Sequence, residues 1–122
     1  LSSSDPRYIG KYGGDRRQRD KAYHNGTVWP WLLGPFTTAF LKLKNYDAQW
    51  RSFAFENFLK PLFTEELHRA GLGLISEIYD GDTPHEPNGC IAQAWSVAEP
   101  LRAYIEDVLS RRPPFEQKIL GS

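Results

Sequence analysis

The sequence contains one cysteine, no methionine and no long apolar stretch. Because Cys90 stands alone, no internal disulfide can form, and a cysteine-based zinc site would need further thiolates or nearby histidines. A chain with so little cysteine is expected in the reducing cytoplasm. We therefore predict a cytoplasmic protein that binds no metal and needs no cofactor.

Other functional classes are excluded by what the chain of 122 residues lacks. No apolar run approaches the roughly 18–20 residues of a membrane span, so no membrane partner is expected. Fifteen Lys and Arg balance fifteen Asp and Glu, which argues against a nucleic-acid binder that works through a basic surface. The chain begins with Leu1 and lacks the basic and apolar parts of a signal peptide. We expect a single partial domain, spanning residues 1–122, that belongs to a longer protein.

Charge is distributed unevenly along the chain. Residues 1–23 carry six Lys or Arg and three Asp, while residues 65–107 carry nine Asp or Glu and two Arg. The first stretch has neither a helical nor a strand period, and it is predicted to be an irregular basic arm.

Apolar residues that recur at intervals of three and four predict amphipathic helices further along the chain. The first helix follows Thr27, a favourable N-cap, and stops near Asn45. The second begins after Asp47, is kinked at Pro61, and ends at Gly71 as the left-handed residue that follows a helix.

Beyond residue 71 the helical period fails until a third helix. Residues 74–79 are predicted to be extended, and the turn-forming residues that follow predict a loop. The third helix runs from about Ala92 to Arg111, with a strain or kink at Pro100, and residues 112–122 form a tail. About three amphipathic helices make the fold class all-α.

Four carboxylates lie within ten residues of this loop without a Lys or Arg among them: Glu77, Asp80, Asp82 and Glu86. If they converge, mutual repulsion should raise the pKa of at least one of them, as acid–base catalysis requires. A calcium loop is the competing interpretation of Asp80 and Asp82, but the sixth and twelfth positions are His85 and Ile91 instead of Gly and Glu. A solvated acidic turn and a catalytic loop both remain open.

Aromatic residues make up 14% of the chain, more than a domain of this size can bury completely. Trp29, Trp31 and Trp95 are either core residues or a platform on which the C–H face of a sugar packs. His24 precedes the tight-turn pair Asn25-Gly26 and has no partner at metal-ligand spacing. It is expected to hydrogen-bond a substrate or the backbone.

Three segments together resemble the C-terminal part of prokaryotic-type glycogen debranching enzymes, the amylo-α-1,6-glucosidases. These segments are 24–35 (HNGTVWPWLLGP), 71–82 (GLGLISEIYDGD) and 89–97 (GCIAQAWSV). They occur in the family's order and at about its spacing, and the likeness covers roughly residues 5–110.

The resemblance implies part of an (α/α)₆ toroid and the hydrolysis of α-1,6-linked glucose at branch points with inversion. By the same likeness, Glu77 is the catalytic general base, and His24, Trp29, Gln93 and Trp95 line the glucose pocket. The implied partners are glycogen, limit dextrin or malto-oligosaccharides, together with the upstream part of the same enzyme, which supplies the general-acid aspartate. The isolated chain would then be inactive.

Two other functions remain open at this stage. The chain could be a non-catalytic carbohydrate-binding module that uses Trp29 and Trp95. It could also be a helical interaction domain whose exposed aromatic residues bury against a partner. The apolar faces of its helices predict self-association of the isolated chain, most simply as a two-fold dimer.

Overall fold

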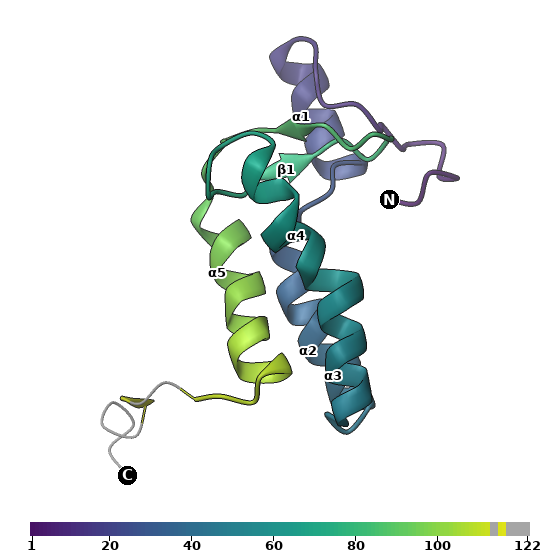
Figure 1. Ribbon diagram of the computed structural model, residues 1–122. Coiled ribbons are helices and arrows are strands. Elements are labelled where there is room, and N and C mark those ends of the chain that lie inside the picture. The colour runs from purple at the N-terminus through teal and green to yellow at the C-terminus, as the bar shows by residue number, and fades with distance from the viewer. Residues whose placement is uncertain (113–114, 117–122) are drawn as a thin grey trace.

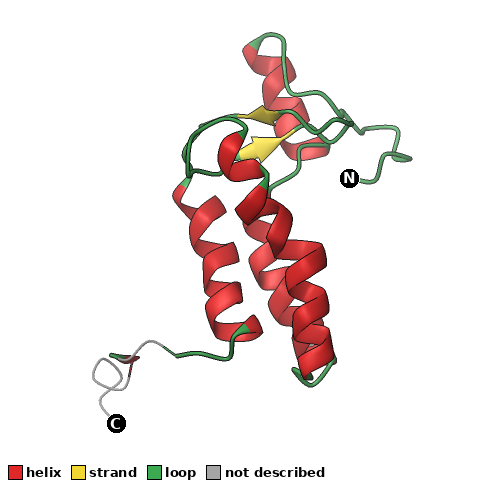
Figure 2. Ribbon diagram, viewed as in Figure 1, coloured by secondary structure: helices red, strands yellow, loops and turns green. Residues whose placement is uncertain are grey.

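The computed structural model describes residues 1–112, 115 and 116. Three helical rods lie side by side, and a further helix, α1, stands above one end of them (Figures 1 and 2). The all-α fold class is confirmed, since the described part of the chain contains only two strands, each of two residues. The predicted tail falls mostly outside the described residues. In chain order the elements are α1 (Arg16–Asn25), η1 (Pro30–Leu32), α2 (Leu33–Leu43), α3 (Ala48–Ala54), η2 (Phe55–Leu59), α4 (Lys60–Thr64), η3 (Glu66–His68), β1 (Ile78–Tyr79), β2 (Pro87–Asn88), α5 (Ala94–Ala103) and η4 (Tyr104–Val108).

Helix α1 corrects the prediction of an irregular arm over residues 1–23. A capping box begins it: the Asp15 side chain accepts from the backbone N–H of Gln18, and the Gln18 side chain accepts from the backbone N–H of Asp15. These bonds satisfy amides that a helix start leaves unpaired. The helix carries almost no apolar face, and Ala22 is its one buried residue. A helix of this kind has no periodic signal to detect.

The first predicted helix begins later than expected. Thr27 is not its N-cap; the Thr27 hydroxyl instead donates to the carbonyl of Ala22, at 3.0 Å, and closes the end of α1. The chain turns through the 3₁₀ segment η1 at Pro30 before α2 starts at Leu33. Pro30 occupies the first turn, where its missing N–H removes no intrahelical bond.

The second predicted helix is a composite rod of α3, the π-helical η2 and α4. Asp47 stands at the N-cap position of α3 as predicted. Pro61 falls in the first turn of α4, directly after η2, so its missing amide coincides with the change of hydrogen-bond period. The rod ends before Gly71, and the glycine with positive φ is Gly73, whose N–H donates to the carbonyl of Leu67.

The third rod consists of α5 followed by the π-helical η4. It starts at Ala94 and ends at Val108, two and three residues inside the predicted bounds. Pro100 lies within α5, where it is fully buried. At Gly34 of α2, an added Cβ would lie 2.7 Å from the backbone carbonyl oxygen of Glu99, so this glycine permits the close approach of α2 to α5.

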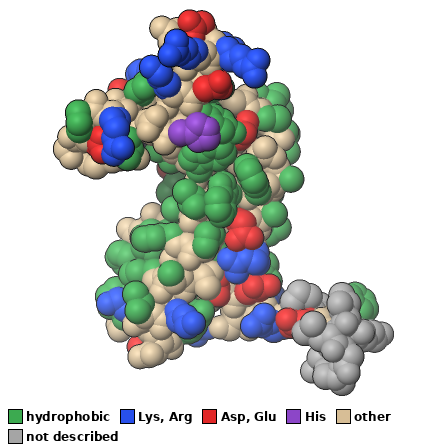
Figure 3. Space-filling model, turned by 180° about the vertical axis from the view of Figure 1, so that it is seen from behind, with side chains coloured by type: hydrophobic (Ala, Val, Ile, Leu, Met, Phe, Trp, Pro, Cys, Tyr) green, Lys and Arg blue, Asp and Glu red, His purple; other side chains and the backbone are tan. Residues whose placement is uncertain are grey.

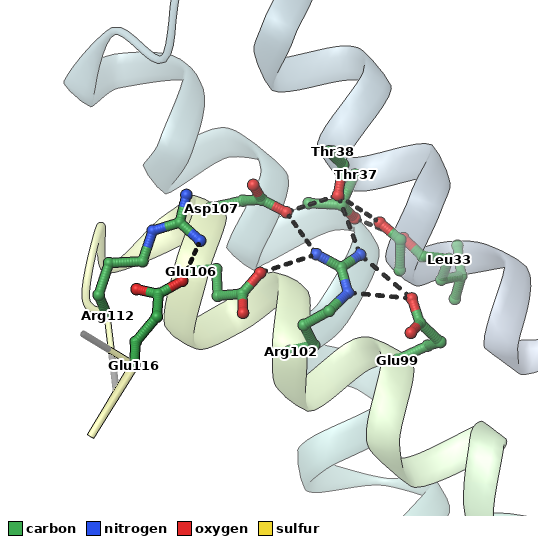
Figure 4. Close-up of polar contacts among 10 residues, drawn as sticks. Leu33, Thr37, Thr38, Glu99, Arg102, Glu106, Asp107, Arg112 and Glu116 are labelled. Carbon is green, nitrogen blue, oxygen red and sulfur yellow. Dashed lines mark hydrogen bonds and ion pairs between the residues drawn. The ribbon is translucent and has the colours of Figure 1, made fainter. Parts of the chain in front are cut away.

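A polar network holds α2 and the third rod together (Figure 4). The Arg102 guanidinium donates to the Thr38 hydroxyl at 3.1 Å, and that hydroxyl lies 2.5 Å from Oδ2 of Asp107. Asp107 is buried, and Arg102 also pairs with Glu99 and Glu106 at 3.1 and 3.3 Å. The network fixes the axial position of α5, whose first residues reach the opposite end of the bundle.

The two strands join segments that are far apart in the sequence. β1 pairs with β2 in antiparallel register, Ile78 opposite Asn88 and Tyr79 opposite Pro87. On its other edge, Tyr79 exchanges two backbone hydrogen bonds of 2.9 Å with Val28. Tyr79 also packs with Leu62 and Ile75 in a buried cluster. The residues before α2, around β1 and before α5 are thereby brought to one place.

Candidate functional site

The site lies where these three segments meet, between α1 and the adjoining end of the helical bundle. Glu77 precedes β1, and its backbone N–H donates to the carbonyl of Cys90 at 2.8 Å. Gln93 continues the same pairing, since its N–H donates to the carbonyl of Ile75 at 3.3 Å. The backbone therefore places the start of α5 beside Glu77.

Both carboxylate oxygens of Glu77 accept hydrogen bonds. The Tyr23 hydroxyl donates to Oε1 at 2.5 Å, and the backbone N–H of Cys90 donates to Oε2 at 3.0 Å. Gly89 has a φ of 69°, and an added Cβ there would lie 2.7 Å from Oε2 of Glu77. Only glycine lets the loop approach this closely in this conformation.

These contacts determine how Glu77 and Tyr23 ionise. The hydrogen bond from Tyr23, followed by that from Cys90, lowers the pKa of Glu77 below its ordinary value, and the Gln93 side chain adds to this. Burial, together with the hydrogen bond to Glu77, raises the pKa of Tyr23 to about 12. At neutral pH, Glu77 is thus a carboxylate, and Tyr23 keeps its proton and donates a hydrogen bond to it.

Aromatic rings extend from this carboxylate along the surface. The ring of Trp29 lies edge-on to that of Tyr23, with centroids 4.4 Å apart, and Trp95 follows at 6.2 Å from Trp29. Trp95 is 45% exposed. Seen from behind, hydrophobic side chains gather between the Lys- and Arg-rich end of the molecule and the charged side chains of the bundle, with a histidine among them (Figure 3).

The remaining two predicted pocket residues lie at the start of α5 and in the last turn of α1. Gln93 is the N-cap of α5, and its side chain accepts from the N–H of Ala94 at 3.1 Å. His24 is exposed in the last turn of α1, and its ring lies edge-on to that of Tyr23 at 5.3 Å. The four predicted pocket residues are thus connected with Glu77. Gln93 contacts it, His24 and Trp29 contact Tyr23, and Trp95 contacts Trp29.

Residues 1–102 match the protein family described as amylo-alpha-1,6-glucosidase. The chain belongs to this family. The match covers α1, the whole of the site and all but the end of the third rod, and it identifies the chain as the C-terminal part of a glycogen debranching-type glycosidase. Comparisons with curated proteins and with solved structures gave no significant match.

In this amylo-α-1,6-glucosidase region the four carboxylates of the acidic loop do not act as one cluster, because each is bound to its own partner. The condition for mutual repulsion is therefore not met, and the pKa of Glu77 is lowered. Asp80 is buried and accepts from the backbone N–H of Tyr12 at 2.8 Å. It therefore fastens the N-terminal segment to the loop.

The other two carboxylates of the loop have equally local contacts. Asp82 accepts from the Tyr8 hydroxyl at 3.1 Å, and Glu86 pairs with Arg69 at 3.6 Å. His85 lies with Nδ1 2.9 Å from the carbonyl oxygen of Asp80. Among the described residues, no three His, Cys, Asp or Glu side chains converge as metal ligands would, and no helix is long and apolar enough to cross a membrane.

Tyr23 is a residue of this candidate site to which the sequence interpretation gave no role. It immediately precedes the segment that resembles the family. It lies in α1, within the range that was predicted to be an irregular arm. Its partner Glu77 is 54 residues away in the chain. The sequence pattern that could have revealed it is the capping box formed by Asp15 and Gln18, which predicts a helix that contains Tyr23 and His24.

Proposed function

We propose that this chain carries the general base of a glycosidase that hydrolyses α-1,6-linked glucose at branch points with inversion of configuration, and that Glu77 is this base. The observation that carries the proposal is the paired hydrogen bonding of Glu77, which keeps the carboxylate ionised and fixed in direction. A general base must be unprotonated before it can accept a proton from water.

The chemistry follows from the inverting mechanism. Glu77 removes a proton from a water molecule, whose oxygen attacks the anomeric carbon while the bond to the leaving oxygen breaks. A carboxylic acid on the opposite side donates its proton to that oxygen, about 6.5–9.5 Å from the base. We assign this acid to an aspartate of the upstream part of the enzyme. The isolated chain should accordingly be inactive.

The surroundings of Glu77 support a glucose unit as the group that is attacked. Trp29 and Trp95 offer aromatic faces for the C–H side of the sugar, and the polar groups of Gln93 and His24 lie beside them. In the (α/α)₆ toroid that the family resemblance implies, the upstream hairpins would close this surface into a pocket. Glycogen, limit dextrin or malto-oligosaccharides are the proposed substrates.

The test combines the chain with the upstream part of its enzyme and measures glucose release from limit dextrin. Glu77→Gln should abolish turnover, because the amide cannot accept the proton. Glu86→Gln is the matched control, since Glu86 lies in the same loop but pairs with Arg69. Full activity of the Glu77→Gln variant would remove Glu77 from the role of base. Product NMR should show β-glucose first, and α-glucose as the first product would contradict inversion.

A further inference from the structure

The aromatic rings near Glu77 form one track that is longer than a single sugar site needs. It runs from Tyr23 to Trp29 at 4.4 Å, to Trp95 at 6.2 Å, and on to Trp31 at 5.9 Å. The last pair is stacked, with 30° between the ring planes. The track begins at the ring whose hydroxyl binds Glu77.

The far end of the track is open. Trp29, Trp31, Leu32 and Trp95 surround a hollow of about 340 Å³, which is at the lower end of the volumes typical of small-molecule sites, about 300–1,000 Å³. Trp95 is 45% exposed and Leu32 is 48% exposed. Trp29 and Trp31 are half-buried, so none of the three indole side chains is enclosed in a core here.

The indole N–H groups strengthen the case for a polar ligand. Those of Trp29, Trp31 and Trp95 donate no hydrogen bond within the described part of the chain, and none of them is buried without a partner. A surface that combines flat apolar faces with unused donors matches a pyranose ring, which has apolar C–H faces and hydroxyl groups at its rim. A purely aliphatic partner would use only the apolar faces.

We propose that Trp31, which is stacked on Trp95, binds a second glucose unit of the polymer, beyond the unit that Trp29 and Trp95 hold against Glu77, and that Trp31 makes the site selective for glucans over small α-1,6-glucosides. The proposal rests on the function proposed for Glu77 and names Trp31 as the residue that adds the further subsite. The continuity of the track with the Glu77 carboxylate supports a sugar chain as its occupant.

The experiment uses the complete enzyme that contains this chain and compares limit dextrin with isomaltose. For Trp31→Ala, KM for limit dextrin should rise about tenfold more than KM for isomaltose, as expected from the loss of one aromatic stacking contact of about 1.4 kcal/mol. Trp31→Phe keeps an aromatic face and should recover most of the loss. An equal change of KM for both substrates would overturn the proposal.

A second variant separates a glucan from a protein segment as the occupant. Leu32 borders the same hollow but has no ring, so Leu32→Ala should raise KM for limit dextrin by much less than Trp31→Ala. If Leu32→Ala has as large an effect, the hollow is an apolar contact surface and the proposal is wrong.

Binding without turnover distinguishes failure of this proposal from failure of the proposed function. Maltoheptaose is titrated into the complete enzyme with and without Trp31→Ala, and tryptophan fluorescence is recorded. Weaker binding in the variant supports the track even if Glu77→Gln proves active. Unchanged affinity refutes the track even if Glu77 is the base.

Discussion

Removal of the Tyr23 hydroxyl tests how the site maintains its carboxylate. In Tyr23→Phe, Oε1 of Glu77 loses its 2.5 Å hydrogen bond, while Oε2 keeps the bond from the Cys90 N–H. A hydrogen bond to a charged group contributes about 1.5–3 kcal/mol. If most of this stabilisation orients the base in the transition state, kcat should fall about tenfold to a hundredfold.

The pH dependence gives the sharper signature. The Tyr23 hydrogen bond is the main cause of the lowered pKa of Glu77, so the substitution should raise that pKa. The acidic limb of the kcat/KM profile on limit dextrin would then move to higher pH, because Glu77 would gain its proton earlier as the pH falls. A merely structural role of Tyr23 would lower activity without moving this limb.

Tyr12→Phe is the matched control for this substitution. The ring of Tyr12 lies 6.1 Å from that of Tyr23, yet its hydroxyl makes no hydrogen bond to Glu77. It should leave the acidic limb in place. The reasoning fails if Tyr23→Phe shows the wild-type pH profile and kcat, or if Tyr12→Phe moves the limb equally.

Three further substitutions test the frame around the site. Gly89→Ala should destabilise the chain by about 1–3 kcal/mol in urea unfolding and reduce turnover, because the residue has positive φ and its Cβ would press on Glu77; wild-type stability would contradict this. Arg102→Met should cost about 1.5–3 kcal/mol, seen as a lower Tm by calorimetry, since it leaves Asp107 buried without its cation; an unchanged Tm would count against the network. We predict that the isolated chain self-associates through its exposed apolar faces, and that Phe36→Glu, at a residue 52% exposed, shifts it to monomer in sedimentation equilibrium; a monomeric wild-type chain would refute this.

The sequence predicted the parts of the fold that depend on apolar periodicity. The three rods have the recurring apolar residues that bury one helical face. The start of the second rod after Asp47 was predicted, and the third rod was predicted within three residues at both ends. Helix α1 was missed because its one buried residue, Ala22, gives no period, and its only signal is the three-residue spacing from Asp15 to Gln18. The start of α2 was misplaced because the Thr27 hydroxyl binds a carbonyl at the C-terminal end of α1 and does not cap the N-terminus of α2.

The sequence selected residues that the structure brings together, but it did not indicate the contacts that determine their pKa values. Resemblance to the family selected Glu77 and its four neighbours, and the structure brings them together. The repulsion expected if the four carboxylates converged does not act on Glu77. Its pKa is lowered mainly by Tyr23, which no spacing connects with Glu77. The roles of Asp80 and Asp82 depend likewise on residues near the N-terminus.

The weak docking of α1 links protonation to local unfolding. Since Ala22 is the one fully buried residue of α1, opening of this helix exposes little apolar surface and should require less free energy than global unfolding. Opening also withdraws the Tyr23 hydroxyl and returns the pKa of Glu77 toward its ordinary value. By linkage, the lowered pKa of Glu77 stabilises the docked state of α1 at pH values above the ordinary pKa of a glutamate. This stabilisation is lost as the pH falls through the lowered pKa. Hydrogen-exchange protection factors of the α1 amides should therefore decrease in acid before those of the three rods, which would make α1 a proton-sensitive cover of the carboxylate.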